Sequence, residues 1–291
     1  MIRKAVLPVA GMGTRVLPAT KVLPKELLPV VDKPLIQFAV EEAAQAGITE
    51  IILVTARGKD LLLDHFDTNA ELERSLDARG KTELLDIARS TCPKGVTITA
   101  VRQPAPLGLG HAVWCARAAI GDEPFAVLLP DDLVLGQTGC LAQLVEVWNR
   151  VKGHVVAVEN VPADHVGRYG ILDVIEENGR VARARGMVEK PNPAQAPSTL
   201  AVIGRYILDP SVFDALERGE RGAGGEIQLT DAIAATLGRV GLHGARFVGT
   251  RHDCGNKAGY VEAVIDAALA HPETAAQVLA YLESILGRRA A

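Results

Sequence analysis

The chain has 291 residues, of which 48% are hydrophobic and 23% charged, so it can bury a sizeable core like an ordinary globular protein. Its aromatic fraction of 4% and its formal net charge of −4, with no long basic block, argue against a nucleic-acid-binding surface. No stretch approaches the roughly 20 apolar residues of a membrane span, and the apolar run near the N-terminus is too short for a signal peptide. The scattered cysteines form no C-x-x-C pair, which predicts reduced thiols in a cytoplasmic protein rather than disulfides or a zinc site.

Strand and helix patterns alternate through the first 135 residues. Residues 4–10 form a short apolar run that passes into a glycine turn, and helical spacing follows at residues 35–46. Further strands are expected at residues 50–55, 97–101 and 125–129, and further helices at 61–66 and 112–119. This alternation predicts a parallel sheet with helices on both faces, and ligands of such sheets bind at the carboxyl ends of the strands.

The rest of the chain has a mixed pattern. Residues 67–92 are charged and rich in leucine, which predicts a helical insertion on the surface. Beyond residue 135 we expect strands at 154–161 and 201–208, a hairpin of 171–176 and 181–188, and helices at 211–216, 229–237, 259–268 and 274–286. We therefore predict a single α/β domain over residues 1–291. Residues 1–135 form a Rossmann-like, mainly parallel sheet flanked by helices, and residues 136–291 form an α+β half packed on it across a cleft.

Residues 11–26 carry the densest set of functional side chains. Gly11 and Gly13 follow the apolar run, and a glycine turn can bring backbone N–H groups close to a phosphate because it has no Cβ. Arg15, Lys21 and Lys25 place three cations in the same segment, which suits a polyphosphate. Neither the G-x-G-x-x-G fingerprint nor a P-loop is present. A glycine pair alone is as often an ordinary turn as a phosphate-binding site.

The full string G-M-G-T-R-V-L-P-A-T-K-V-L-P-K-E-L-L-P of residues 11–29 resembles the signature of the sugar-phosphate nucleotidylyltransferases. In detail it is similar to the bacterial uridylyltransferases that act on UTP and glucose 1-phosphate, and the resemblance covers residue 2 to about 270. It implies a nucleotidyltransferase fold, Mg²⁺ as cofactor, a homodimer or homotetramer, and formation of UDP-glucose and pyrophosphate. Residues 1–135 would then bind the nucleotide, and residues 136–291 would bind the sugar and end in helices.

Gln103 begins a glycine-rich loop, Q-P-A-P-L-G-L-G-H-A, that leads into a helix. A glutamine side chain offers both a donor and an acceptor to a base edge, and Gly108 would let the base lie against the backbone. The bare sequence fits an ordinary helix start equally well. The resemblance implies a nucleotide site made of Ala10, Gly11, Gly13, Thr14, Glu26, Gln103 and Gly108.

Asp131 and Asp132 directly follow the strand expected at residues 125–129. Two carboxylates at a strand end are typical of Mg²⁺ binding, because this ion prefers oxygen ligands together with substrate phosphates. They are equally typical of an Asx turn or a helix N-cap. The resemblance implies that Asp131 binds the metal and Asp132 faces the sugar, and it leaves open whether Asp253 is a second metal ligand.

Glu189 and Lys190 belong to a V-E-K-P string that alone could be a charged strand end. Neighbours on an extended strand point to opposite sides, so both can face one ligand only if the backbone kinks. Pro191 makes a kink plausible, although it also biases Lys190 toward extended geometry. The resemblance implies that Glu189 binds sugar hydroxyls, that Lys190 binds the sugar phosphate, and that Gly170 and Gly204 line the same pocket.

The resemblance also implies the role of each charged residue in the reaction. Arg15 would bind the β- and γ-phosphates of UTP, Lys25 the α-phosphate region and Lys190 the incoming sugar phosphate, with the metal on Asp131. The string E-I-Q-L-T-D at residues 226–231 predicts a helix start with Thr230 as N-cap, supporting the sugar pocket. Two alternatives remain: a thymidylyltransferase-like sibling with another base or sugar, and a non-catalytic sensor of nucleotide sugars.

Overall fold

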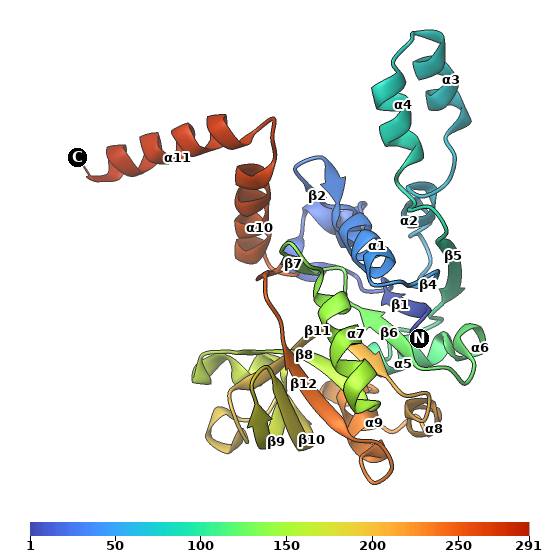
Figure 1. Cartoon of the computed structure of the whole chain (residues 1–291), viewed down its shortest axis with the longest axis vertical. Helices are drawn as coiled ribbons and strands as arrows, with labels where there is room; N and C mark the ends of the chain where they lie inside the picture. The colour runs from blue at the N-terminus through green and yellow to red at the C-terminus, as the bar shows by residue number, and fades with distance from the viewer. Residues whose placement is uncertain (291) are drawn as a thin grey trace.

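A single nine-stranded sheet runs through both halves of the sequence in the computed structural model, which describes residues 1–290 (Figure 1). The strand order is β5-β4-β1-β6-β11-β8-β12-β10-β9. The bounds of these strands, in chain order, are β1 Lys4–Pro8, β4 Glu50–Thr55, β5 Thr97–Arg102, β6 Phe125–Leu128, β8 His154–Asn160, β9 Gly170–Asn178, β10 Val181–Glu189, β11 Leu200–Leu208 and β12 Leu242–Arg246.

The first four strands of the sheet are parallel, as the alternating pattern predicts. β1 pairs in parallel with β4 and with β6, and β4 pairs in parallel with β5. The carboxyl ends of β1, β5 and β6 therefore lie along one edge of the sheet. The glycine turn, Gln103 and Asp131 each follow one of these ends, so chain segments far apart in sequence converge there.

The second half of the chain adds five more strands to the same sheet. β11 lies antiparallel to β6, and β8 lies antiparallel to β11 and parallel to β12. β10 and β9 form the expected hairpin at the sheet edge, with Asn178 paired to Val181. Backbone hydrogen bonding from β6 to β11 thus makes the two halves continuous.

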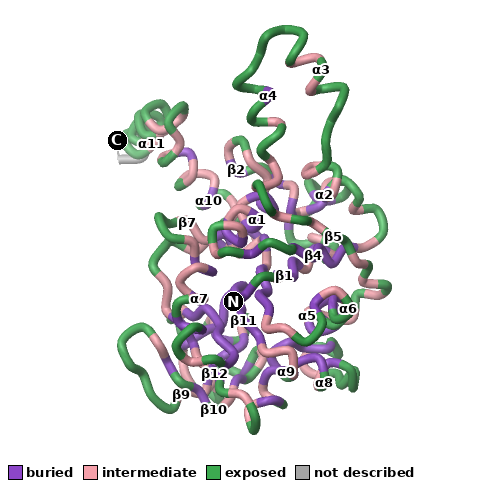
Figure 2. The backbone as a smooth tube through the Cα atoms, turned by 45° about the vertical axis from the view of Figure 1, so that its right-hand side comes forward, coloured by how far each residue is buried: buried purple, intermediate pink, exposed green. Residues whose placement is uncertain are grey.

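Helices cover both faces of the sheet, and alternate side chains enter two different cores. In β1, Val6 belongs to one core, and Ala5 and Leu7 belong to the other. The purple segments of Figure 2 follow these strands through the centre of the molecule. The helices over the first core are α5 Leu109–Cys115, α6 Arg117–Ile120, α8 Val212–Glu217 and α9 Leu229–Thr236, and those over the second are α1 Leu35–Gln45 and α7 Cys140–Val151.

A smaller core ties the N-terminal loop to the end of the chain. Val16, Leu28, Leu133 and Cys254 are buried together in it. Its members include residues of the helical turn Thr14–Val16, β2 Pro29–Val30, β7 Asp132–Leu135 and the helix α10 Lys257–Ala270. The same part of the chain contains the helical turns Ala19–Lys21 and Lys25–Leu27, β3 Lys33–Pro34, which pairs with β2, and β13 Thr250–Asp253, which pairs with β7. Neither β7 and β13 nor their pairing was among the predicted elements.

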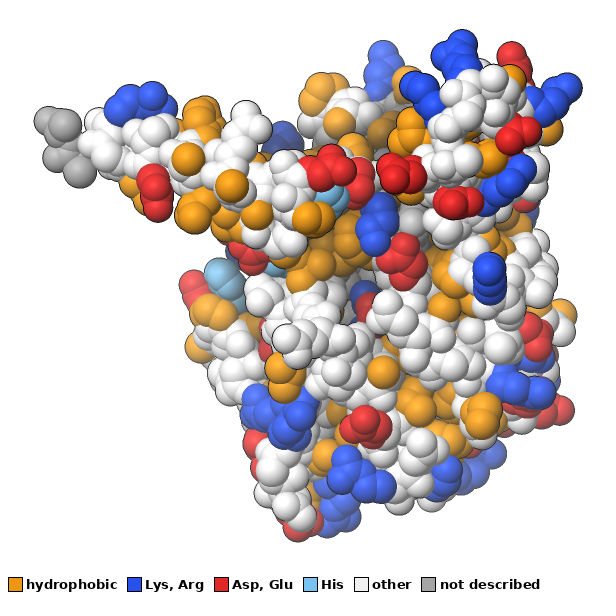
Figure 3. All heavy atoms as spheres, turned by 45° about the horizontal axis from the view of Figure 1, so that its top comes forward, with side chains coloured by type: hydrophobic (Ala, Val, Ile, Leu, Met, Phe, Trp, Pro, Cys, Tyr) orange, Lys and Arg blue, Asp and Glu red, His pale blue; other side chains and the backbone are white. Residues whose placement is uncertain are grey.

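Two helical segments project from the body in Figure 1. The first is the expected surface insertion, formed by α3 Ala70–Ala78 and α4 Thr82–Arg89 after the short α2 Leu61–Asp64. The second is α11 Ala275–Ala290, whose hydrophobic side chains are visible along the projecting arm in Figure 3. Among residues 1–290, no helix is long and apolar enough to cross a membrane. The remaining short helical turns are Ala163–Arg168, Pro193–Gln195 and Ala223–Gly225.

Candidate active site

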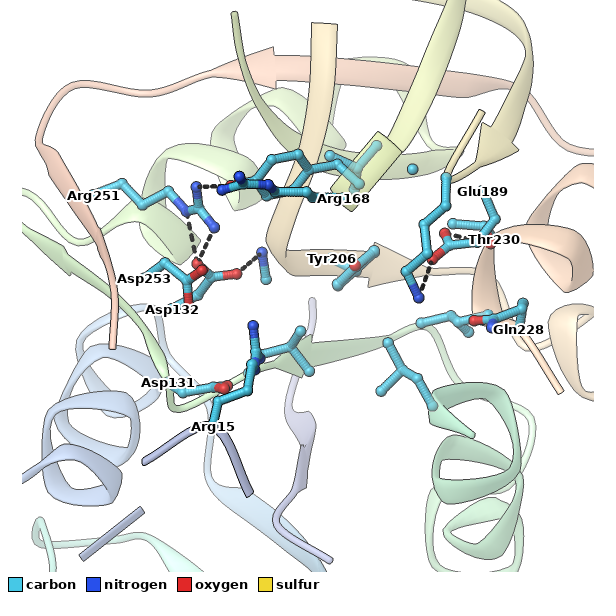
Figure 4. Close-up of a pocket in the computed structure, with 18 residues that line it drawn as sticks. Arg15, Asp131, Asp132, Arg168, Glu189, Tyr206, Gln228, Thr230, Arg251 and Asp253 are labelled. Atoms are coloured by element: carbon cyan, nitrogen blue, oxygen red, sulfur yellow. Dashed lines mark hydrogen bonds and ion pairs between the residues drawn. The ribbon is translucent and has the colours of Figure 1, made fainter. Parts of the chain in front are cut away.

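Two cavities meet at the carboxyl edge of the parallel strands. The larger, of about 490 Å³, lies against the glycine turn and the Gln103 loop. The smaller, of about 330 Å³, lies between β11, the β9–β10 hairpin and the start of α9 (Figure 4). Arg15, Asp131 and Lys190 line both cavities, so a ligand in one can contact a ligand in the other beside these charged groups.

Five of the seven expected nucleotide residues line the larger cavity. They are Ala10, Gly11, Glu26, Gln103 and Gly108. Gly13 and Thr14 are not among the residues lining either cavity. Gly13 has φ 64°, and a Cβ on this residue would lie within 3.3 Å of the side chains of Thr20 and Lys25. Gly13 therefore shapes the turn.

Gln103 is held by the loop that it begins. Its Nε2 donates to the carbonyl oxygen of Gly108 at 3.1 Å and lies 3.1 Å from Nδ1 of His111. We expected the amide to offer a donor and an acceptor, but the donor is engaged, which leaves Oε1 as the group for a ligand. Gly108 has φ 111°, and a Cβ there would lie 2.7 Å from the carbonyl oxygen of Ile227, so only glycine fits.

Lys59 is a member of the nucleotide-side cluster that the sequence did not single out. Its Nζ lies 3.0 Å from Oε2 of Glu26 and donates to the carbonyl oxygen of Val9, the residue before the glycine turn. Burial raises the pKa of Glu26 against the opposing charge of Lys59, and burial lowers the pKa of Lys59. Glu26 Oε1 has no hydrogen-bond partner within the described chain, so a donor from a ligand would satisfy it.

Lys25, Asp131, Asp253 and Arg15 converge where the cavities meet. Nζ of Lys25 lies 2.5 Å from Oδ2 of Asp131. A Cβ on Gly255 would lie 2.8 Å from Oδ2 of Asp131, 2.9 Å from Oδ1 of Asp253 and 2.8 Å from the Arg15 guanidinium, so three charged groups surround one point. Such a point suits a ligand with charges of both signs, such as a phosphate with a bound cation.

The same carboxylates meet the requirements of Mg²⁺. This ion is usually bound through one or two carboxylates and completes its octahedron with water and substrate phosphates. Within residues 1–290 there is no group of three or more His, Cys, Asp or Glu side chains able to hold a metal alone. Two nearby carboxylate oxygens, on Asp131 and Asp253, therefore fit an ion that arrives with the nucleotide.

The smaller cavity brings together all the expected sugar-side residues: Asp132, Gly170, Glu189, Lys190 and Gly204. Lys190 has φ 46°, so it adopts a left-handed conformation and not the extended one expected before proline. This kink lets Glu189 and Lys190 line the same cavity, with Lys190 Nζ 3.3 Å from Glu189 Oε1. The hydroxyl of Thr230 donates to Glu189 Oε2 at 3.0 Å; Gln228, not Thr230, is the N-cap of α9.

Arg251 and Arg168 are sugar-side residues that sequence reasoning missed. Both line the smaller cavity, and Arg168 lies across it from Asp131 and Arg15 in Figure 4. Arg251 pairs with Asp132, whose Oδ2 accepts a hydrogen bond from the backbone N–H of Gly204 at 2.9 Å. Burial raises the pKa of Asp132 although Arg251 opposes the shift. The only sequence signal for Arg251 was its place two residues before Asp253.

A family model described as Nucleotidyl transferase matches residues 4–268. The chain belongs to this nucleotidyl transferase family. It is 54% identical over 256 residues to a UTP–glucose-1-phosphate uridylyltransferase of Komagataeibacter xylinus, covering 88% of this chain and 90% of the relative. It is 46% identical over 287 residues to a UTP–glucose-1-phosphate uridylyltransferase of Bacillus subtilis (strain 168), covering 99% of this chain and 98% of the relative.

Solved structures of nucleotidyl transferases have the same fold. A UTP-bound UGPase from Acinetobacter baumannii is 43% identical with a TM-score of 0.89, covering 98% of this chain and 99% of that one. A UDP-glucose pyrophosphorylase complexed with UDP-glucose is 41% identical with a TM-score of 0.83, covering 93% and 100%. These values confirm the predicted fold class, a mixed α/β nucleotidyltransferase fold.

Proposed function

We propose that this nucleotidyltransferase makes UDP-glucose and pyrophosphate from UTP and glucose 1-phosphate. The observation that carries the proposal is the junction of two cavities at Arg15, Asp131 and Lys190. The larger cavity has the volume and the glycine turn for a nucleotide, and the smaller has hydrogen-bonding groups for a sugar. The Acinetobacter relative is UTP-bound and another relative is complexed with UDP-glucose; both have matching folds, which supports the assignment.

The reaction is an in-line attack of the sugar phosphate oxygen on the α-phosphorus of UTP, with pyrophosphate leaving on the opposite side. Both reactants are anionic, so the site must hold them together and stabilise the developing charge. Lys190 binds the incoming sugar phosphate, Lys25 stabilises the α-phosphate, and Arg15 binds the departing β- and γ-phosphates. The phosphate nucleophile needs no base at neutral pH, and no covalent enzyme intermediate is required.

Mg²⁺ is the cofactor that we propose, held by Asp131 and Asp253 together with the phosphates. When bound, the ion neutralises negative charge that builds up on the reacting phosphates. Lys25 keeps the Asp131 carboxylate ionised and oriented before the nucleotide arrives.

On the nucleotide side, Gln103 Oε1 accepts a hydrogen bond from the uracil N3–H. The backbone of Ala10, Gly11 and Gly108 lies close to the nucleotide. Gly13 and Thr14 shape the turn around the phosphates. On the sugar side, Glu189 accepts from hydroxyl groups, and the walls are Asp132, Gly170 and Gly204. We propose that residues 1–291 act as one domain, with nucleotide contacts mostly from residues 1–135 and sugar contacts mostly from 136–291.

A homodimer or homotetramer is the proposed assembly. Leu279, Tyr281 and Leu286 of α11 are each more than half exposed on the projecting arm (Figure 3). Apolar side chains on a projecting helix are typical of surfaces that pack against another chain. The free thiols of all four cysteines support the expected cytoplasmic location.

The test is pyrophosphate release measured over a matrix of nucleoside triphosphates and sugar 1-phosphates. The pair UTP and glucose 1-phosphate should give the highest kcat/KM. A preference for dTTP would favour the thymidylyltransferase alternative. Binding of UDP-glucose without turnover of any pair would favour the non-catalytic sensor.

A further inference from the structure

Arg251 in β13 is the buried charge of the sugar cavity to which the mechanism above gives no role. Its side chain is 8% exposed. Nε and one terminal nitrogen lie 2.6 and 2.5 Å from Oδ1 of Asp132, and the other terminal nitrogen donates to Glu159 at 2.8 Å. The guanidinium also lies 5.2 Å from the ring centroid of Tyr169. One side chain therefore joins β13, β7, β8 and the residue before β9.

Through Asp132, Arg251 controls one wall of the cavity. Asp132 Oδ2 accepts from the backbone N–H of Gly204 at 2.9 Å, so both carboxylate oxygens are engaged (Figure 4). A Cβ on Gly204 would lie 2.7 Å from that oxygen and 2.8 Å from Cβ of Leu129, so the wall tolerates little movement. A displaced Asp132 would thus change the width of the cavity at Gly204.

Through Tyr169, Arg251 also contacts the part of the cavity lining that carries Lys190. The carbonyl oxygen of Tyr169 accepts a hydrogen bond from the backbone N–H of Lys190 at 2.9 Å. Lys190 is in a left-handed conformation, which is costly for a residue other than glycine and persists only where the surroundings fix it. Its surroundings include this hydrogen bond and, behind it, the Tyr169 side chain, whose ring packs on Arg251 and whose hydroxyl lies 3.4 Å from an Arg251 nitrogen.

We infer that Arg251 is a positioning residue for the sugar 1-phosphate, setting the distance between the Gly204 wall and the Lys190 segment. The inference rests on the proposed function, because it assigns the smaller cavity to the sugar. Arg251 also compensates the charge of Asp132, whose cross-strand partner is Asp253 and whose chain neighbour is Asp131. Without the guanidinium, three carboxylates would crowd the junction, and one of them would be a buried charge without its partner.

The experiment measures KM for each substrate in wild type, Arg251→Met, Arg251→Lys and the double variant Arg251→Met/Asp132→Asn. Arg251→Met should raise KM for glucose 1-phosphate by about 10-fold or more, the size expected for a broken buried charge pair, and change KM for UTP by less than about two-fold. Arg251→Lys should restore part of the loss. The double variant should bind sugar phosphate better than Arg251→Met, because the uncompensated carboxylate is gone.

Arg246→Met is the matched control, because this arginine pairs with Glu177 and does not line either cavity. It should leave both KM values unchanged. If Arg251→Met folds poorly, calorimetry on Arg251→Lys gives the same test. Its affinity for UDP-glucose should fall, and its affinity for UTP should stay at the wild-type value. Equal loss for both ligands, or a double variant worse than Arg251→Met, would overturn the inference. A wild type that does not use UTP and glucose 1-phosphate would instead remove the proposed function.

Discussion

Nζ of Lys25 lies 2.5 Å from Oδ2 of Asp131, although 106 positions separate the two residues in the chain. Burial alone would raise the pKa of Asp131, but the Lys25 ammonium outweighs it and holds that pKa below its usual range. Burial likewise acts to lower the pKa of Lys25, but the negative charges of Asp131 and Glu26 together outweigh it, so the pKa of Lys25 is raised. Both groups are therefore charged near neutral pH, and the site holds a cation and an anion before substrates bind.

Lys25→Ala should lower kcat by more than about 100-fold, the size expected for losing one contact to transition-state charge. Lys21→Ala is the matched control: Lys21 is an exposed cation in the same segment that is not among the residues lining either cavity. Steady-state pyrophosphate release should therefore be normal in the control. Near wild-type turnover in Lys25→Ala would remove this residue from the mechanism.

Asp131→Asn keeps the shape of the side chain but removes a charge, so activity should fall steeply and the Mg²⁺ concentration for half-maximal activity should rise. Asp253→Asn should shift the Mg²⁺ requirement in the same direction, because its oxygen lies near the same point. The measurement is activity as a function of Mg²⁺ at saturating substrates. A metal requirement unchanged in both variants would place the ion elsewhere.

Gln103→Leu should mainly weaken UTP binding and the preference for UTP over CTP. The uracil N3–H would lose its acceptor, a contact worth roughly 0.5–1.5 kcal/mol or more where a polar edge stays buried and unpaired. Gln143→Leu, in α7 and outside both cavities, is the control. If Gln103→Leu still prefers UTP as strongly as wild type, the base is read by other groups, with Glu26 and Lys59 the next to test.

Glu189→Ala should cut kcat/KM for glucose 1-phosphate by about 10- to 200-fold, because a hydrogen bond to a charged group is worth roughly 1.5–3 kcal/mol. The preference over 3- and 4-deoxy analogues should also weaken. Lys190→Met removes a cation that any sugar 1-phosphate needs. The value of kcat/KM should therefore fall by a similar factor for all three substrates, and the selectivity among them should be unchanged. Equal losses for the three sugars in Glu189→Ala would show that Glu189 does not read those hydroxyls.

The elements predicted correctly are those whose signals are local in sequence. β4, which follows α1, and the β9–β10 hairpin were readable from spacing and turn residues. One such signal was missed: Leu141, Leu144, Val147 and Trp148 are buried at helical spacing in α7. The helix expected over residues 112–119 is interrupted at Ala116, and no residue type in that stretch announces the break.

The parts of the site that could not be predicted depend on contacts between distant segments. Asp132 lies opposite Asp253 only because β7 pairs with β13, two short strands with 114 residues between them. Arg251 and Lys59 act through partners that are distant in the chain, Asp132 and Glu26, and their neighbours in sequence do not indicate these contacts. The left-handed Lys190 is likewise imposed by its surroundings, against the local preference before proline.

Two cavities that meet at the reacting phosphates should hold the two halves of UDP-glucose. A crystal structure of this protein with UDP-glucose and Mg²⁺ would show whether they do. The uracil should lie in the cavity lined by Gln103 and Gly108, the glucosyl ring in the cavity lined by Glu189 and Gly204, and the diphosphate beside Asp131. A glucosyl ring in the larger cavity, or a diphosphate out of reach of Asp131, would show that the two cavities do not have these roles.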